Sequence, residues 1–134
     1  MRRSERERRL QIIATNYGRD AGWIVEYRGR PVAELTDPRF ADMFWYSYRV
    51  EPRSEEPAER ESLLTSPDRW LACEFVYRNR QFGLVAENAF PAGGVFPESG
   101  RILMRALYLD IDSPTVWERL LLWLRGSREA AWNA

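Results

Sequence analysis

Residues 23–32 read WIVEYRGRPV, and this stretch decides the fold that we expect. Residues that favour β-strands stand on both sides of an Arg-Gly pair, and glycine tolerates the positive φ of a tight turn. A two-residue loop at that pair places Tyr27 opposite Arg30 and Val25 opposite Val32. The stretch therefore predicts an antiparallel β-hairpin.

A second segment of the same kind begins fifty positions later, where residues 73–82 read CEFVYRNRQF. It repeats the Tyr-Arg-x-Arg apex with asparagine in place of glycine, and asparagine also tolerates positive φ. The same loop length places Tyr77 opposite Arg80 and Phe75 opposite Phe82. Shared turn chemistry explains the likeness, because it fades beyond these few residues; an ancient duplication is the alternative.

A third strand is predicted over residues 43–50, MFWYSYRV. Strand alternation divides this segment between two faces, with Phe44, Tyr46, Tyr48 and Val50 on one and Trp45, Ser47 and Arg49 on the other. An Asp-Pro pair at 37–38 indicates a turn before it, and residues 101–110 predict a later strand. Residues 10–15 are compatible with a first strand, and a helix that begins at Ser4 is the competing interpretation.

The C-terminal part of the chain predicts one amphipathic helix. Ser113 is placed to cap it, Pro114 occupies its first position and Gly126 is placed to end it. The apolar residues form one broad stripe for the core: Val116, Trp117, Leu120, Leu121, Trp123 and Leu124. Leu122 falls among the polar residues, so we expect it to be partly exposed.

Together these elements predict the α+β class, with a six- to seven-stranded, mostly antiparallel, twisted or part-closed sheet in hairpin order and one C-terminal amphipathic helix packed on it. A length of 134 residues predicts a single domain. We expect residues 1–9 to be a charged, frayed N-terminus, 10–126 the domain and 127–134 a tail. Residues 52–69 are expected to be a surface excursion and 90–100 a loop.

The composition excludes much of the common catalytic repertoire. All twenty basic residues are arginine, and the chain has no histidine, so imidazole bases, His metal ligands and catalytic lysines are absent. A single cysteine, Cys73, excludes an internal disulfide, and its strand position predicts a small buried hydrophobe. With no apolar run of about 18 residues, we expect a cytoplasmic protein with no membrane segment. We also expect no cofactor and no metal, since the chain has no histidine and a single cysteine.

The leading functional hypothesis is a small, non-catalytic protein-interaction module, of an accessory or inhibitor type. Trp, Tyr and Arg are enriched at interface hot spots, and this chain is rich in all three. The candidate contact residues are Trp45, Tyr48, Arg49, Tyr27, Arg30, Tyr77, Arg80 and Phe96. A further candidate contact residue is Trp132. The core is expected to contain Trp23, Trp117 and Trp123. An exposed Leu122 suggests a homo-oligomer through the helix face.

Two other classes of function stay open. A ligand-binding or carboxylate-dependent enzyme domain would place a site between the sheet and the 90–100 loop, using two of Glu26, Glu34, Glu74 and Asp110. A single-strand nucleic-acid binder would stack bases on the aromatic residues of 43–50 beside Arg49. The zero net charge speaks against nucleic acid, because twenty arginines face twenty acids.

Overall fold

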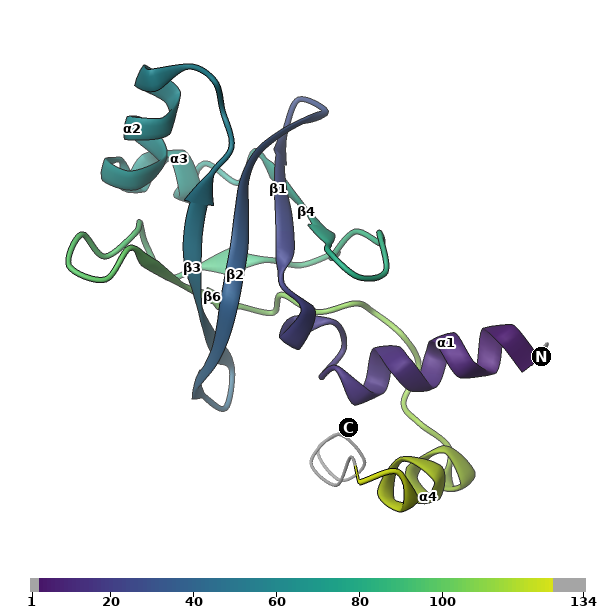
Figure 1. The fold of residues 1–134 in the computed structure, drawn as a ribbon. Coiled ribbons are helices and arrows are strands. Elements are labelled where there is room, and N and C mark those ends of the chain that lie inside the picture. The colour runs from purple at the N-terminus through teal and green to yellow at the C-terminus, as the bar shows by residue number, and fades with distance from the viewer. Residues whose placement is uncertain (1–2, 127–134) are drawn as a thin grey trace.

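A computed structural model describes residues 3–126 of the chain as a curled, six-stranded antiparallel sheet with several helices (Figure 1). The predicted α+β class is confirmed. The strand order is β4-β1-β2-β3-β6-β5. The strands are β1 (Trp23–Tyr27), β2 (Arg30–Asp42), β3 (Trp45–Pro52), β4 (Phe75–Asn79), β5 (Phe90–Pro91) and β6 (Arg101–Arg105).

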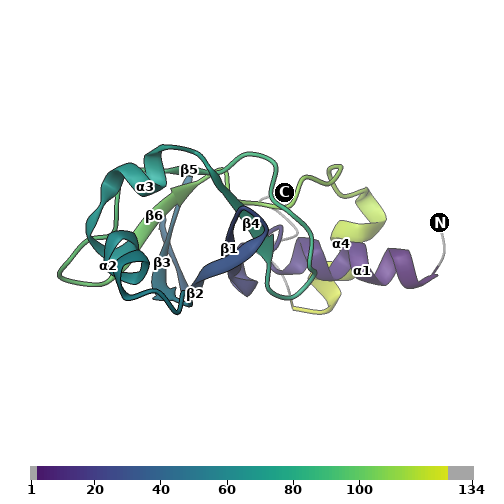
Figure 2. The ribbon, with the colours of Figure 1, turned by 90° about the horizontal axis from the view of Figure 1, so that it is seen from above.

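The helices gather at two opposite ends of the sheet. They are α1 (Arg3–Ala14), the short 3-10 helix η1 (Arg19–Ala21), α2 (Pro57–Thr65), α3 (Pro67–Leu71) and α4 (Val116–Leu124). Helices α2 and α3 lie at one end, whereas α1 and α4 lie side by side at the other end (Figures 1 and 2). Both α2 and α3 begin within residues 52–69, which we expected to be a surface excursion, but they bury Leu63 and Trp70 in the main core. Among residues 3–126, no helix combines the length and apolar character that a membrane crossing requires.

The first predicted hairpin is confirmed at its turn. Tyr27 pairs with Arg30, and the two residues between them have positive φ, 51° at Arg28 and 79° at Gly29. Val25 pairs with Ala33 instead of Val32, because a β-bulge shifts the register just after Val25.

The second predicted hairpin has a different geometry. Strand β4 pairs with β1 and ends at Asn79, whose buried side chain donates to the carbonyl of Gly18 at 2.8 Å and accepts from the amides of residues 81 and 82. The chain returns only where the Asn79 amide donates to the carbonyl of Leu84 at 2.7 Å. The expected pairing of Phe75 with Phe82 is therefore wrong, because Asn79 nucleates a wider turn.

Strand β2 continues through the Asp-Pro pair that we expected to be a turn. Asp37 has a φ of 48° within an irregularity of the β2–β3 pairing. The buried Arg101 holds this irregularity from β6, since its guanidinium donates to the Asp37 carboxylate at 2.9 Å and to the Ser47 hydroxyl at 2.7 Å. Residues 43 and 44 make the turn instead, and β6 ends at Arg105, earlier than predicted.

The N-terminal part of the described chain is a helix. Residues 3–9, which we expected to be frayed, form its first turns, and the helical interpretation of residues 10–15 is confirmed over the strand. Leu10, Ile12 and Ile13 are buried on α1, so tertiary packing overrides the strand preference of isoleucine. Residues 1–2 and 127–134, including the expected tail and Trp132, lie outside the described residues.

The main core lies on the inner face of the curled sheet, where Trp23 is fully buried as expected. Tyr46, Tyr48 and Val50 share a buried face, so the predicted alternation of this strand is confirmed. The Tyr48 hydroxyl donates to the carbonyl of Arg19 at 2.8 Å and accepts from the indole of Trp23 at 3.2 Å. These bonds allow the polar tips of two large aromatic residues to be buried.

Candidate functional site

Helix α4 turns its apolar face towards solvent, and this face is the main candidate site. Val116 is 83% exposed and Trp117 is 74% exposed, although the sequence predicted both in the core. The exposed apolar residues follow helical spacing: Val116, Trp117, Leu120, Trp123 and Leu124. We call these five residues the α4 face.

The opposite side of α4 packs on α1, not on the sheet as expected. Leu122 is 1% exposed and forms a separate small core with Leu10 and Ile13 of α1. The prediction that Leu122 is exposed is therefore wrong, and a buried Leu122 cannot mediate self-association. Of the six residues predicted to be buried, five are exposed, and Leu121 is partly buried against this small core. The cause is that α4 meets another helix through a narrow contact, which one leucine fills.

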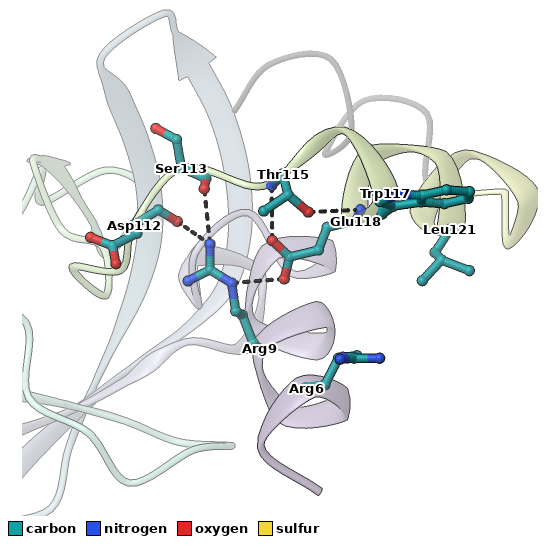
Figure 3. Close-up of a pocket in the computed structure, with 8 residues that line it drawn as sticks. All are labelled: Arg6, Arg9, Asp112, Ser113, Thr115, Trp117, Glu118 and Leu121. Atoms are coloured by element: carbon teal, nitrogen blue, oxygen red, sulfur yellow. Dashed lines mark hydrogen bonds and ion pairs between the residues drawn. The ribbon is translucent and has the colours of Figure 1, made fainter. Parts of the chain in front are cut away.

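Polar contacts fix this orientation of α4. Thr115 caps the helix, not Ser113, because its hydroxyl accepts from the Glu118 amide at 3.2 Å while the Glu118 carboxylate accepts from the Thr115 amide at 2.9 Å. The Glu118 carboxylate also accepts from Nε of Arg9 on α1 at 2.7 Å (Figure 3). Residues 115–118 carry the Thr-x-x-Glu pattern of a capping box in the sequence. The prediction of Ser113 as the cap relied instead on the Ser-Pro pair that precedes this pattern.

Arg9 also anchors the segment that leads into α4. Its Nη2 donates to the carbonyls of Asp112 at 2.7 Å and Ser113 at 2.9 Å (Figure 3). Burial raises the pKa of Glu118, but the hydrogen bonds from Thr115 and the charge of Arg9 outweigh it, so the net pKa lies below its ordinary value. Glu118 is therefore an ionised, positioned carboxylate that holds a helix in place.

A pocket of about 490 Å³ opens between α1 and α4 beside the α4 face. Trp117 and Leu121 form its apolar wall, and the Arg9–Glu118 pair lies on its polar side (Figure 3). Arg6 lines the pocket from α1 and makes no ion pair with any residue in 3–126. The pocket thus combines an apolar wall with an exposed cation.

The contact residues predicted from the sequence do not form one surface. Tyr48 and Tyr77 are buried, so the expectation that they contact a partner from the surface is wrong. The exposed members are Arg30, Arg49, Arg80 and Phe96, and Tyr27 and Trp45 are partly buried. Arg49, Phe96 and Trp45 lie in one region of the sheet. Arg49 and Phe96 both pair with Arg101, and Trp45 lies four residues before Arg49 on the same face of β3. Tyr27 and Arg30 lie apart, at the β1–β2 turn.

The strand carboxylates have structural partners. Glu26 accepts from Nε of Arg78 at 3.1 Å, and Glu34 accepts from the guanidinium of Arg53. Within residues 3–126, no group of three or more acidic or cysteine side chains could hold a metal ion. Cys73 is exposed with a φ of 57°, not a buried strand residue, because β4 begins two positions later.

No known protein family, curated protein or solved structure matches this chain. The assignment of a function therefore depends on the geometry and chemistry of its own surfaces.

Proposed function

We propose that this protein is a non-catalytic protein-interaction module that binds a partner through the α4 face. One observation carries the proposal: α4 buries the polar Glu118 at 7% exposure and leaves Trp117 and most of the apolar stripe in solvent. The exposed fractions and the size of tryptophan put this surface on the order of 500 Å². Contiguous apolar patches of that size are often binding sites.

The shape of the α4 face favours a helical partner. Its residues recur at the spacing by which one helix lays its apolar side against another. The helix is nine residues long, which is about 13 Å, so it matches about two turns of a partner helix. Two exposed tryptophans supply the residue type that dominates interface hot spots.

The charge beside the α4 face favours an acidic flank on that partner helix. Arg6 lines the pocket next to Trp117, and its guanidinium has no ion pair within residues 3–126. A partner that places an apolar side chain against Trp117 and Leu121 brings its neighbouring residues to Arg6. We therefore propose an amphipathic helix that carries a carboxylate at the edge of its apolar stripe.

The other two classes of function have less support. Two of the four carboxylates suggested for an enzyme are engaged with arginines, Glu26 with Arg78 and Glu34 with Arg53. The aromatic residues suggested for base stacking include Tyr46 and Tyr48, which are both buried. A single-strand platform needs exposed rings along a basic groove, and this chain has no net charge.

A photocrosslinking experiment tests the proposal. A photoreactive phenylalanine derivative replaces Trp117 in the native host, and mass spectrometry locates the crosslinked residues on the partner. The proposal expects a single dominant partner, crosslinked within an amphipathic helix next to an acidic residue. Crosslinks scattered over many proteins, or to a second copy of this chain, would overturn the assignment of that partner.

Affinity measurements with the purified partner then separate the α4 face from the sheet surface. Trp117→Ala and Leu124→Ala are each expected to weaken binding by at least ~10-fold, because hot-spot truncations cost on the order of 2 kcal/mol. The control is Phe96→Ala, a half-exposed aromatic residue on the 90–100 loop, which should leave the affinity unchanged. Loss of binding in the control variant alone would move the interface to the sheet surface around Arg49.

A further inference from the structure

A second pocket, of about 250 Å³, lies between β4, α3 and the segment 86–91. It shares no lining residue with the pocket beside α4. Its aromatic lining comes from Trp70, Phe75, Tyr77 and Phe90, and Cys73 and Glu87 add polar groups. The volume corresponds to about eight water-sized volumes of ~30 Å³ each, so a ligand of fewer than about ten heavy atoms fits.

The hydroxyl of Tyr77 lacks a partner in this pocket. The side chain is 5% exposed, and no group in residues 3–126 forms a hydrogen bond with its hydroxyl. Tyr48, which is equally buried, makes two hydrogen bonds through its own hydroxyl. The buried side-chain atoms that lack a partner within residues 3–126 belong to Thr36, Glu59 and Arg69, so the Tyr77 hydroxyl is not sealed in the core. As an accessible, unpartnered hydroxyl on a residue that lines the pocket, it is open to a ligand atom.

The charges around the pocket select the class of ligand. Glu87 is its one lining residue with a formal charge at neutral pH, and none of the described arginines lines it. An anion would therefore meet only repulsion, whereas a cation would gain from a carboxylate and from the faces of aromatic rings.

The aromatic wall is held in place from outside the pocket. The rings of Trp70 and Phe75 meet edge to face with centroids 5.0 Å apart, and the Trp70 indole donates to the carbonyl of Leu63 at 2.9 Å. Arg69, which does not line the pocket, lies over the Phe75 ring at 5.5 Å. A second cation is therefore best placed away from Arg69, on the side of Tyr77 and Glu87.

We propose that this pocket binds a small primary alkylammonium or arylalkylammonium ion. Its N–H groups donate to the Glu87 carboxylate and to the Tyr77 hydroxyl oxygen, and its apolar part packs against Trp70 and Phe90. This site is independent of the proposed binding of a partner protein at the α4 face.

Three ring compounds of similar size and different charge test the proposal: benzylammonium, benzyl alcohol and benzoate. The readout is the Trp70 indole signal and the amide signals of residues 86–90 in NMR titrations of the full chain. The proposal expects saturable shifts with benzylammonium, at least ~10-fold weaker binding of benzyl alcohol and no binding of benzoate. Absence of saturation with benzylammonium, or equal binding of the neutral or anionic compound, would overturn it.

Matched variants identify the groups that recognise the ammonium ion. Glu87→Gln and Tyr77→Phe are each expected to weaken benzylammonium binding by ~10-fold or more, and Glu98→Gln, on the exposed 90–100 loop, should have no effect. Tyr77→Phe removes a hydroxyl without a partner, so it should not impair folding. Trp117→Ala should leave the titration unchanged, which separates this site from the α4 face. Unaltered affinity in both pocket variants would reject the site.

Discussion

Nε of Arg9 lies 2.7 Å from Oε2 of Glu118, and this ion pair joins the first and last helices of residues 3–126. Both side chains are largely withdrawn from water, with exposures of 16% and 10%. Because Glu118 faces α1, the apolar residues on the other side of α4 face solvent. A buried ion pair is weak evidence for stability, but here it specifies an orientation.

Removal of Arg9 should destabilise the protein strongly. Arg9→Met leaves the Glu118 carboxylate buried without its cation, which costs about 3 kcal/mol in comparable pairs. The double variant Arg9→Met/Glu118→Gln should recover much of this loss, because glutamine keeps the capping box without the charge. Urea unfolding measures both free energies.

A control for the Arg9 prediction is Arg125→Met. Arg125 also joins α4 to α1, through Glu7 at 3.0 Å, but both side chains are about half exposed. Its removal should leave the urea midpoint almost unchanged, because solvent screens the pair. Equal losses for Arg9→Met and Arg125→Met would show that burial of the first pair is unimportant.

The stability contributed by Glu118 should depend on pH in the acidic range. The folded-state pKa of Glu118 lies below the ordinary value of 4.5, so the unfolded chain takes up the proton first as the pH falls. The contribution is therefore complete above about pH 4.5 and is lost as the pH falls through the folded pKa. Urea midpoints of wild type and Glu118→Gln should converge between pH 7 and pH 3. A gap of constant size would contradict the lowered pKa.

Alanine substitutions on the two sides of α4 should differ sharply. Leu122→Ala should cost about 3 kcal/mol of unfolding free energy, because it opens a cavity beside Leu10 and Ile13. Trp117→Ala should change stability by less than ~0.5 kcal/mol, because this side chain is mostly in solvent. Thermal or urea unfolding of the two variants checks the orientation of α4, and the reverse order of losses would contradict it.

Two buried tyrosines should respond differently to loss of the hydroxyl. Tyr48→Phe leaves the Trp23 indole and the Arg19 carbonyl without their partner and should cost about 2 kcal/mol. Tyr77→Phe removes a hydroxyl without a partner in residues 3–126 and should be neutral within ~0.5 kcal/mol. The comparison uses unfolding free energies, and a comparable loss in both variants would mean that the Tyr77 hydroxyl has a partner in the folded protein.

Local patterns predicted the parts of the fold that local geometry controls. The turn between Tyr27 and Arg30 follows from its glycine, and the alternation of β3 follows from the period of a strand. The wider turn after β4 escaped prediction, because it depends on a bond from the Asn79 side chain to Gly18, which is distant in the chain. The first helix was ambiguous, since Leu10 and Ile13 suit a strand or a helix until their partner is known.

The candidate sites were not predictable in the same way. A helical wheel identifies the apolar stripe of α4, but it does not say which side meets the rest of the molecule. That choice depends on Arg9 and Leu10, more than a hundred positions from Glu118 and Leu122. The pocket at Tyr77 was not predicted either. The sequence placed Tyr77 opposite Arg80 near the tip of a hairpin, whereas in the structure it lines a pocket.

The sequence by itself determined which chemistry is absent and where the strands alternate, because composition and short-range periodicity need no tertiary contacts. It excluded histidine and lysine chemistry, and it predicted an antiparallel sheet with Trp23 inside. Only the tertiary structure decided which aromatic residues face solvent. The physical reason is that burial depends on the pairing of elements far apart in the chain, and here one ion pair and one leucine contact orient α4.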